Sequence, residues 1–137
     1  MANVNASGYQ AFVKDGPDGS DITQVLSFTG DAAIADVIRF GTVAAGVSVL
    51  DLSVLVVAAT TSLTASVGWA YVDGSDADPD AFIAAGTSLA AVGRIRSNVG
   101  TPPIVFAKPA YLTMTIAGAA LAAKTFHLVP VVQTIGQ

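Results

Sequence analysis

The sequence predicts an all-β protein, an antiparallel β-sandwich of jelly-roll type with about eight strands and one short helix near residues 79–85. Two observations carry the strand prediction. Within Val47–Val72, apolar residues alternate with small or polar ones at a period of two, the spacing at which side chains of a strand share one face. Clusters of Gly, Pro and Asp recur at short intervals along the chain, as they do between the strands of sandwiches.

The segment Val47–Val72 is predicted to be the central hairpin, two long strands folded back through an Ala/Thr/Ser turn. Val, Leu, Thr, Trp and Tyr are abundant in it and suit a half-buried pleated surface. Each arm has one apolar face that is expected to cover the core. These faces consist of Leu50, Leu52, Val54 and Val56 in the first arm, and Leu63, Ala65, Val67, Trp69 and Tyr71 in the second.

Further strands are expected on both sides of this hairpin, because short alternating segments there are bounded by turn residues. Residues 1–8 are expected to form a polar N-terminal arm, and residues 9–137 a single β-sandwich domain. The predicted strands are Tyr9–Lys14, Ile22–Phe28, Asp36–Val43, Arg94–Val99, Ile104–Lys108, Ala110–Ala117 and Lys124–Ile135.

The short helix is predicted from capping signals. Asp78 is a good N-cap residue, Pro79 suits the first helical position, and Asp80 adds negative charge at the positive end of a helix. Gly86 provides a natural end to the segment.

The same stretch also resembles the start of a calcium-binding loop, because alternate carboxylates provide the hard oxygen ligands that Ca²⁺ prefers. The EF-hand pattern requires Gly at its sixth and an acid at its twelfth position, where this chain has Ala81 and Thr87. That mismatch excludes an EF-hand, and we predict that the protein needs no metal. The acidic residues concerned are Asp73, Asp76, Asp78 and Asp80.

Other candidate residues favour structural roles. His127 is the single histidine, and no G-x-S-x-G motif accompanies it, so we predict no catalytic residues and no enzyme activity. Arg94 and Arg96 would share a face of a strand, either to bind a carboxylate of a partner or as solvated edge charges. Trp69 and Tyr71 could stack on a sugar, but their place on an apolar face favours a core role.

The composition indicates an assembling protein. Hydrophobic residues make up 53% and charged residues 12% of the chain, whereas about 25% charged is typical of soluble domains. No apolar run approaches the roughly 18 residues of a spanning helix, so no membrane is expected. The few basic residues are scattered, which argues against nucleic acid. Cysteine is absent, which excludes disulfides and thiolate chemistry. The surplus apolar surface is expected to lie in subunit contacts.

Three segments of the chain resemble small virion proteins of tailed bacteriophages, in particular head decoration (capsid cement) proteins. They are IRFGTVAAGVSVLDLSVLV, SVGWAYVDGSDADPDAFIAA and KPAYLTMTIAGAALAAKTFHLV, and the likeness covers about Ala35 to Val132.

The start of the chain, MANVNASGYQ, lacks the charged-then-apolar pattern of a signal peptide, so the protein is expected to be made in the host cytoplasm. The resemblance implies a β-sandwich that binds the capsid exterior of the virion and clamps the major capsid protein. It implies a homo-oligomer, with a homotrimer favoured and a dimer possible, and neither cofactor nor catalytic residues. Related small β proteins at the head–tail junction or in tails stay open as an alternative. A glycan-binding β-sandwich module is another alternative, since fold alone does not give function.

Overall fold

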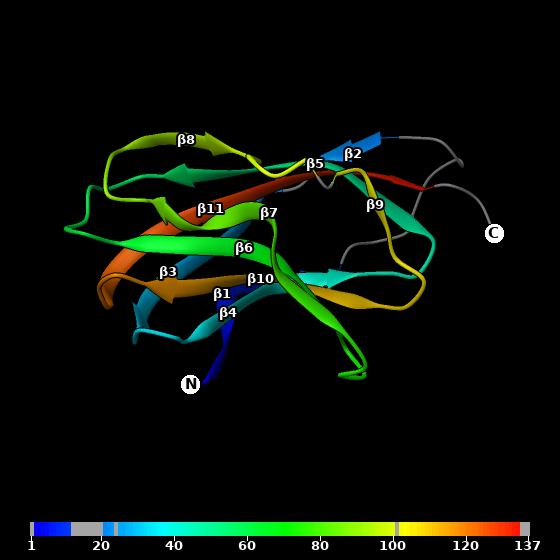
Figure 1. Cartoon of the computed structure of the whole chain (residues 1–137), viewed down its shortest axis with the longest axis horizontal. Coiled ribbons are helices and arrows are strands. Elements are labelled where there is room, and N and C mark those ends of the chain that lie inside the picture. The colour runs from blue at the N-terminus through cyan, green and yellow to red at the C-terminus, as the bar shows by residue number, and fades with distance from the viewer. Residues whose placement is uncertain (1, 12–20, 24, 101, 135–137) are drawn as a thin grey trace.

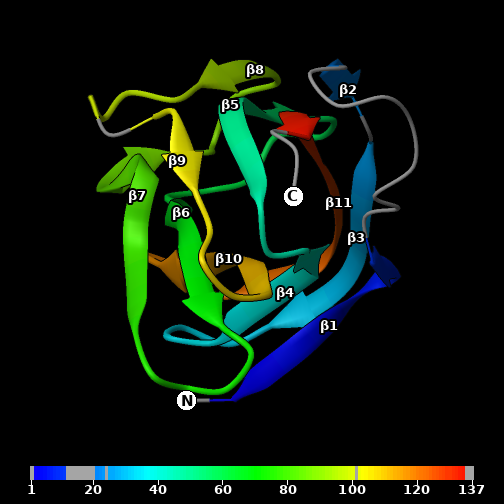
Figure 2. The ribbon, with the colours of Figure 1, turned by 90° about the vertical axis from the view of Figure 1, so that its right-hand side faces the viewer.

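The structure is a computed structural model that describes residues 2–11, 21–23, 25–100 and 102–134. Two β-sheets wrap around one core (Figures 1 and 2). One sheet, called sheet A, has the strand order β1 (Asn3–Ala11), β4 (Val37–Val43), β10 (Ala110–Ala117), β6 (Thr64–Tyr71) and β7 (Ala77–Ser88).

The other sheet, called sheet B, is built on β11 (Leu121–Thr134) and β5 (Val47–Val56), which pair side by side. On the far side of β11 lie β2 (Asp21–Thr23) and β3 (Leu26–Ala32). On the far side of β5 lie β8 (Gly93–Arg96) and β9 (Ile104–Val105).

The predicted all-β sandwich is confirmed. Eight described strands have seven residues or more, matching the expected number, and β2, β8 and β9 are shorter. The described strand pairs are antiparallel except for β1 with β4. From β3 to β6 the chain crosses between the sheets at every connection, as in a jelly roll.

The prediction of a central hairpin is wrong. β5 pairs with β11, β8 and β9, whereas β6 pairs with β10 and β7, so the two arms lie in opposite sheets. The alternation of apolar residues identifies the buried face of each arm but not the strand with which the arm pairs. The apolar faces of both arms do cover the same core. The connection 57–63 therefore passes from one sheet to the other instead of forming a tight turn.

β5 also contains an irregularity that the sequence did not reveal. Val49 and Asp51 pair with consecutive residues of β11, so Leu50 is an extra residue, a β-bulge. The bulge reverses the alternation along the strand. Val47 and Val49 are buried before it and Leu52, Val54 and Val56 after it, while Leu50 is half-buried.

The predicted helix over 79–85 is also wrong, since the described residues contain no helix and this segment belongs to β7. Val67 pairs with Ile83 and Trp69 with Asp78, so residues 79–82 form a wide bulge opposite Gly68. Pro79 cannot donate to a strand ladder, which suits a bulge. The bulge buries Ala81, Phe82 and Ile83 together. An isolated helix of this length is marginal in water, so burial decides the conformation.

The core fills the space between the sheets. Its largest fully buried side chains are Phe40, Phe82, Phe106, Phe126, Leu26, Ile38, Leu52, Leu63, Ile83, Leu89, Leu112 and Met114. The outer edge of β7 is covered by Asn98, whose backbone N–H donates to the Phe82 carbonyl at 3.0 Å and whose Oδ1 accepts from the Ala84 N–H at 2.8 Å. A covered edge is less open to pairing with another strand.

At the N-terminus, β1 runs across the expected boundary between the arm (1–8) and the domain (9–137), and it pairs with β4 from Asn3 onward. The division of the chain at that point stays a prediction. The predicted strand Tyr9–Lys14 extends into residues outside the described part. Among the described residues, no helix is long and apolar enough to cross a membrane.

Candidate interaction surfaces

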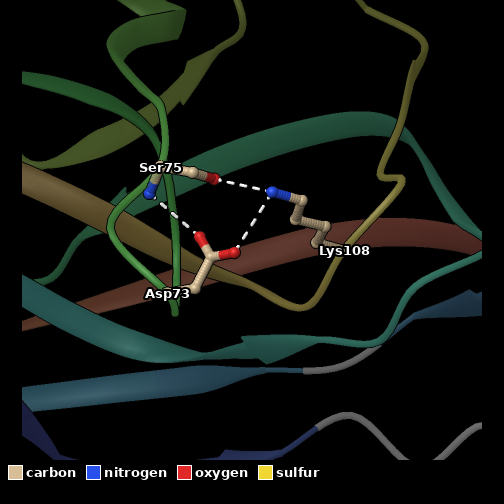
Figure 3. A network of polar contacts seen from close by, with 3 residues as sticks. All are labelled: Asp73, Ser75 and Lys108. Carbon is tan, nitrogen blue, oxygen red and sulfur yellow. Dashed lines mark hydrogen bonds and ion pairs between the residues drawn. The ribbon is translucent and has the colours of Figure 1, made fainter.

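The two ends of the sandwich differ in chemistry. One end, called the charged end, is formed by the turn 72–76 between β6 and β7 and the loop 106–109 between β9 and β10. The turn lies at the lower right of Figure 1. The Lys108 ammonium donates to the Asp73 carboxylate at 3.1 Å and to the Ser75 hydroxyl at 3.0 Å, and the Ser75 N–H donates to Asp73 at 2.9 Å (Figure 3). This network ties the turn to the loop.

The electrostatics of the network favour an ionised Asp73. Hydrogen bonds from the side chain and backbone of Ser75, followed by the bond from Lys108, lower the pKa of Asp73 to about 2. A carboxylate whose charged form accepts several hydrogen bonds is stabilised in that form. Asp73 is therefore a fixed negative charge paired with Lys108.

Beneath this network lies an aromatic cluster. The ring of Trp69 contacts that of Tyr71 with centroids 4.8 Å apart and that of Phe106 at 5.5 Å. Lys108 Nζ lies 5.5 Å from the Tyr71 ring centroid, within reach of a cation–π contact. Trp69 and Tyr71 are half-buried rather than fully buried. A sugar-stacking platform needs an open aromatic face, which Lys108 and the ring contacts oppose.

Two exposed valines flank the charged end. Val72 is 46% and Val105 is 54% exposed, and the Val72 N–H donates to the Pro109 carbonyl at 3.0 Å. The charged end thus combines exposed aliphatic side chains with an ion pair, the mixture found in contacts between different proteins.

The opposite end, called the loop end, lies at the left of Figure 1. It consists of parts of four connections, 33–35, 57–61, 90–92 and 117–120, whose residues are all Ala, Gly, Val, Ile or Thr. Asp36, which completes the first connection, is half-buried, and its carboxylate accepts from the Ala2 and Ala33 N–H groups. Ile34 is 57%, Val57 52% and Val92 64% exposed. These are three of the six large hydrophobic side chains that stand exposed in the described part of the chain.

Backbone hydrogen bonds join these segments in two pairs. The Thr60 N–H donates to the Ala90 carbonyl at 2.9 Å, and the Ala35 N–H donates to the Ile116 carbonyl at 2.8 Å. Close packing of Gly118 against the Ser62 carbonyl links the two pairs. Strand pairing places Val56 opposite Gly93, which brings Val57 beside Val92. This surface was not predicted from the sequence, although the lack of charged residues in all four segments was a visible signal.

The acidic run does not converge on one point. Asp73 pairs with Lys108, and Asp76 accepts from the Ala77 N–H at 2.8 Å. The Asp78 carboxylate accepts a hydrogen bond from the backbone of Asp80, so the contact expected of a helix cap is present without a helix. Burial and the nearby Asp80 carboxyl raise the pKa of Asp78. In the described residues, no group of three or more His, Cys, Asp or Glu is placed to hold a metal ion. The absence of a metal requirement stays a prediction.

The two arginines and the histidine lie on the outer face of sheet B. Arg96 pairs with Asp51 at 3.3 Å, with the arginine side chain 73% exposed, and exposed pairs of this kind contribute little stability. Arg94 lies opposite Leu55 in the pairing of β8 with β5. The structure does not bring the arginines to a common ligand.

His127 forms a cross-strand pair with Ser27, whose Oγ lies 2.7 Å from the imidazole Nδ1. The described residues supply no carboxylate bonded to this histidine and enclose no pocket beside it. Catalysis by a Ser–His pair also requires a base oriented by a third group, so the geometry here favours a strand contact.

The structure of this chain is similar to the structures of two known proteins, and the similarity concerns the fold. No family model matches the sequence, and no curated protein matches it. A chain in the capsid of Ralstonia phage GP4 has a TM-score of 0.73 and 18% identity over 92% of each chain. A chain in the cyanophage Pam1 capsid asymmetric unit has a TM-score of 0.61 and 18% identity over 91% of each chain. The chain therefore shares its fold with chains of two phage capsids.

Proposed function

We propose that this chain is a non-enzymatic structural protein of a phage virion that binds the outer surface of the capsid and stabilises it. The observation that carries the proposal is the shared fold with a chain of the GP4 capsid over 92% of both chains. Equal coverage means that the two chains have about the same length, so a protein of this size and fold is already a capsid component elsewhere.

The chemistry of the surface supports a binding role. The described residues enclose no pocket, and their best Ser–His pair has no further catalytic partner. A protein that ties neighbouring subunits together needs only complementary surfaces, and each bound copy opposes the separation of the subunits that it bridges.

The charged end is the surface that we assign to the major capsid protein. Its exposed Val72 and Val105 supply apolar contact, and the Lys108–Asp73 pair supplies charges of both signs. Contacts between different proteins use such complementary charges for register and specificity. The protein is proposed to act as a homo-oligomer, with a homotrimer favoured and a dimer possible, because a trimer matches a local three-fold axis of an icosahedral shell.

A structural protein of the head–tail junction or tail is the second candidate, because the fold alone does not give the position in the virion. A glycan-binding module is less favoured, since Lys108 lies against the Tyr71 ring.

The test mixes purified protein with capsids that lack it. We expect the protein to sediment with the capsids and to raise the temperature at which they release their contents. Val105→Asp should weaken binding because it places a charge in the proposed contact. Thr29→Asp, an exposed position on the outer face of sheet B, serves as the control. Protein that stays in the supernatant and leaves heat release unchanged would refute the proposal.

A further inference from the structure

We infer that the loop end is the surface through which copies of this chain bind one another. The inference deepens the proposed homo-oligomer and rests on the proposed function for its biological setting. It starts from Val57 and Val92, which lie side by side, and from Ile34 on another turn of the same end, each more than half exposed. Isolated proteins rarely leave such clustered aliphatic side chains in water.

The distribution of charge points to a second copy as the occupant. The chain carries a net charge of −4, so two copies repel each other when they meet through most of their surface. The four segments of the loop end contain no ionisable side chain. A contact between copies at this end brings no like charges face to face and buries no unpaired charge.

Charges of opposite sign stand at the rim of this surface. Asp31 and Asp36 flank the segment 33–35, while Arg94 follows the segment 90–92. In a closed ring, each copy contacts the next through two different patches of its surface. The acidic rim of one molecule can therefore meet the Arg94 side of the next. A capsid protein would instead be recognised through charges within the contact, and the charged end offers those.

The local structure suits a preformed contact surface. The turns are tied by backbone hydrogen bonds, among them Thr60 to Ala90 at 2.9 Å and Ala35 to Ile116 at 2.8 Å. Small residues such as Ala and Gly lose little side-chain entropy when they are buried. Association at this end therefore orders few side chains, which lowers the entropy cost of binding.

The experiment is sedimentation velocity over a dilution series with the full chain. The wild type should sediment as a dimer or trimer. Val57→Asp and Val92→Asp should each raise the concentration of half-dissociation by about 100-fold, since a carboxylate in the contact is neither solvated nor paired. Val105→Asp, at the charged end, should leave the oligomer unchanged. Cooperative urea unfolding would show that all three variants are folded, with lower midpoints for the two dissociated variants because association stabilises the native state.

The results separate this inference from the proposed function. A monomeric wild type would overturn the inference, and so would loop-end variants that keep the oligomer of the wild type. An oligomer that dissociates only with Val105→Asp would also overturn it, because the contact would then lie at the charged end. A wild-type oligomer that Val57→Asp dissociates, but that ignores capsids, would uphold the inference and count against the proposed function.

Discussion

The backbone of Asp78 passes directly over Gly68, so a Cβ atom on Gly68 would collide with the Asp78 carbonyl oxygen. This contact exists because β7 bulges over residues 79–82 opposite Gly68. The bulge then directs Phe82 and Ile83 into the core. A residue without a side chain is thus required in the middle of β6 for its neighbour to take this shape.

Gly68→Ala is expected to destabilise the protein by about 1–3 kcal/mol, the usual cost of forcing extra atoms into a packed site. The neighbouring atoms are backbone, which cannot turn aside. Urea unfolding measures the effect as a lower midpoint. Gly100→Ala is the matched control, because a Cβ there meets nothing within 4 Å. Equal midpoints for the two variants would contradict the described path of β7.

The strands were predictable where one face is buried and the alternation along the strand is unbroken. The predicted segment Ala110–Ala117 is β10 residue for residue, because its period-two pattern is uninterrupted and the extra residue in its pairing with β4 lies in β4. The pattern could not show that β5 and β6 belong to opposite sheets, since partners far apart in sequence decide that. Capping residues suggested a helix at 79–85, where burial of Phe82 and Ile83 overrides local propensity.

The aromatic cluster should carry stability in proportion to its burial. Phe106→Ala is expected to cost about 3–5 kcal/mol, since Phe106 is 1% exposed and its removal leaves a cavity. Trp69→Ala should cost less, because Trp69 is only half-buried. Val105→Ala, on an exposed side chain, should stay within about 0.5 kcal/mol of the wild type. A Trp69 variant with the wild-type urea midpoint would show that its ring is free and would revive the sugar-stacking hypothesis.

Calcium should leave the thermal unfolding temperature unchanged. A ligand that binds only the native state must raise that temperature. The Asp73 carboxylate is engaged by Lys108 and Ser75, and the described residues do not assemble a set of metal ligands. The measurement is thermal melting with added calcium and with chelator. A rise with calcium would show a site in the acidic run, and Asp76→Asn and Asp80→Asn would locate it.

The candidate surfaces were harder to predict than the strands. Trp69 and Tyr71 were predictable as core candidates, but the contact of Lys108 with the Tyr71 ring was not, since the two residues are far apart in the chain. The loop end is made of four separate turns that the fold brings together. A surface assembled from distant segments leaves only a compositional trace in the sequence, in this case the lack of charge.

Asp73 should make the protein less stable in acid. Its pKa is about 2 in the folded protein and 3.8 when free, so its stabilising contribution is fully present above pH 3.8 and is lost as the pH falls toward 2. Asp73→Asn should remove this part of the pH dependence, measured as the urea midpoint against pH. Lys108→Met should reduce it, leaving the bonds from Ser75. An Asp73 variant whose acid profile equals that of the wild type would contradict the network.

Asp78 should act in the opposite direction, because its folded pKa is raised above 3.8 by burial and by the Asp80 carboxyl. The folded state then binds the proton more tightly than the unfolded chain, so this group adds stability below pH 3.8 and loses it as the pH rises through the folded pKa. Asp78→Asn keeps an acceptor for the Asp80 backbone and removes the charge. We therefore expect a higher urea midpoint than wild type at neutral pH, with the difference shrinking in acid.

Asp80→Asn should reproduce part of the gain in urea midpoint, since it removes the neighbouring charge while leaving Asp78 desolvated. A lower midpoint for Asp78→Asn at neutral pH would mean that the ionised carboxylate is stabilising, which would contradict the raised pKa of Asp78.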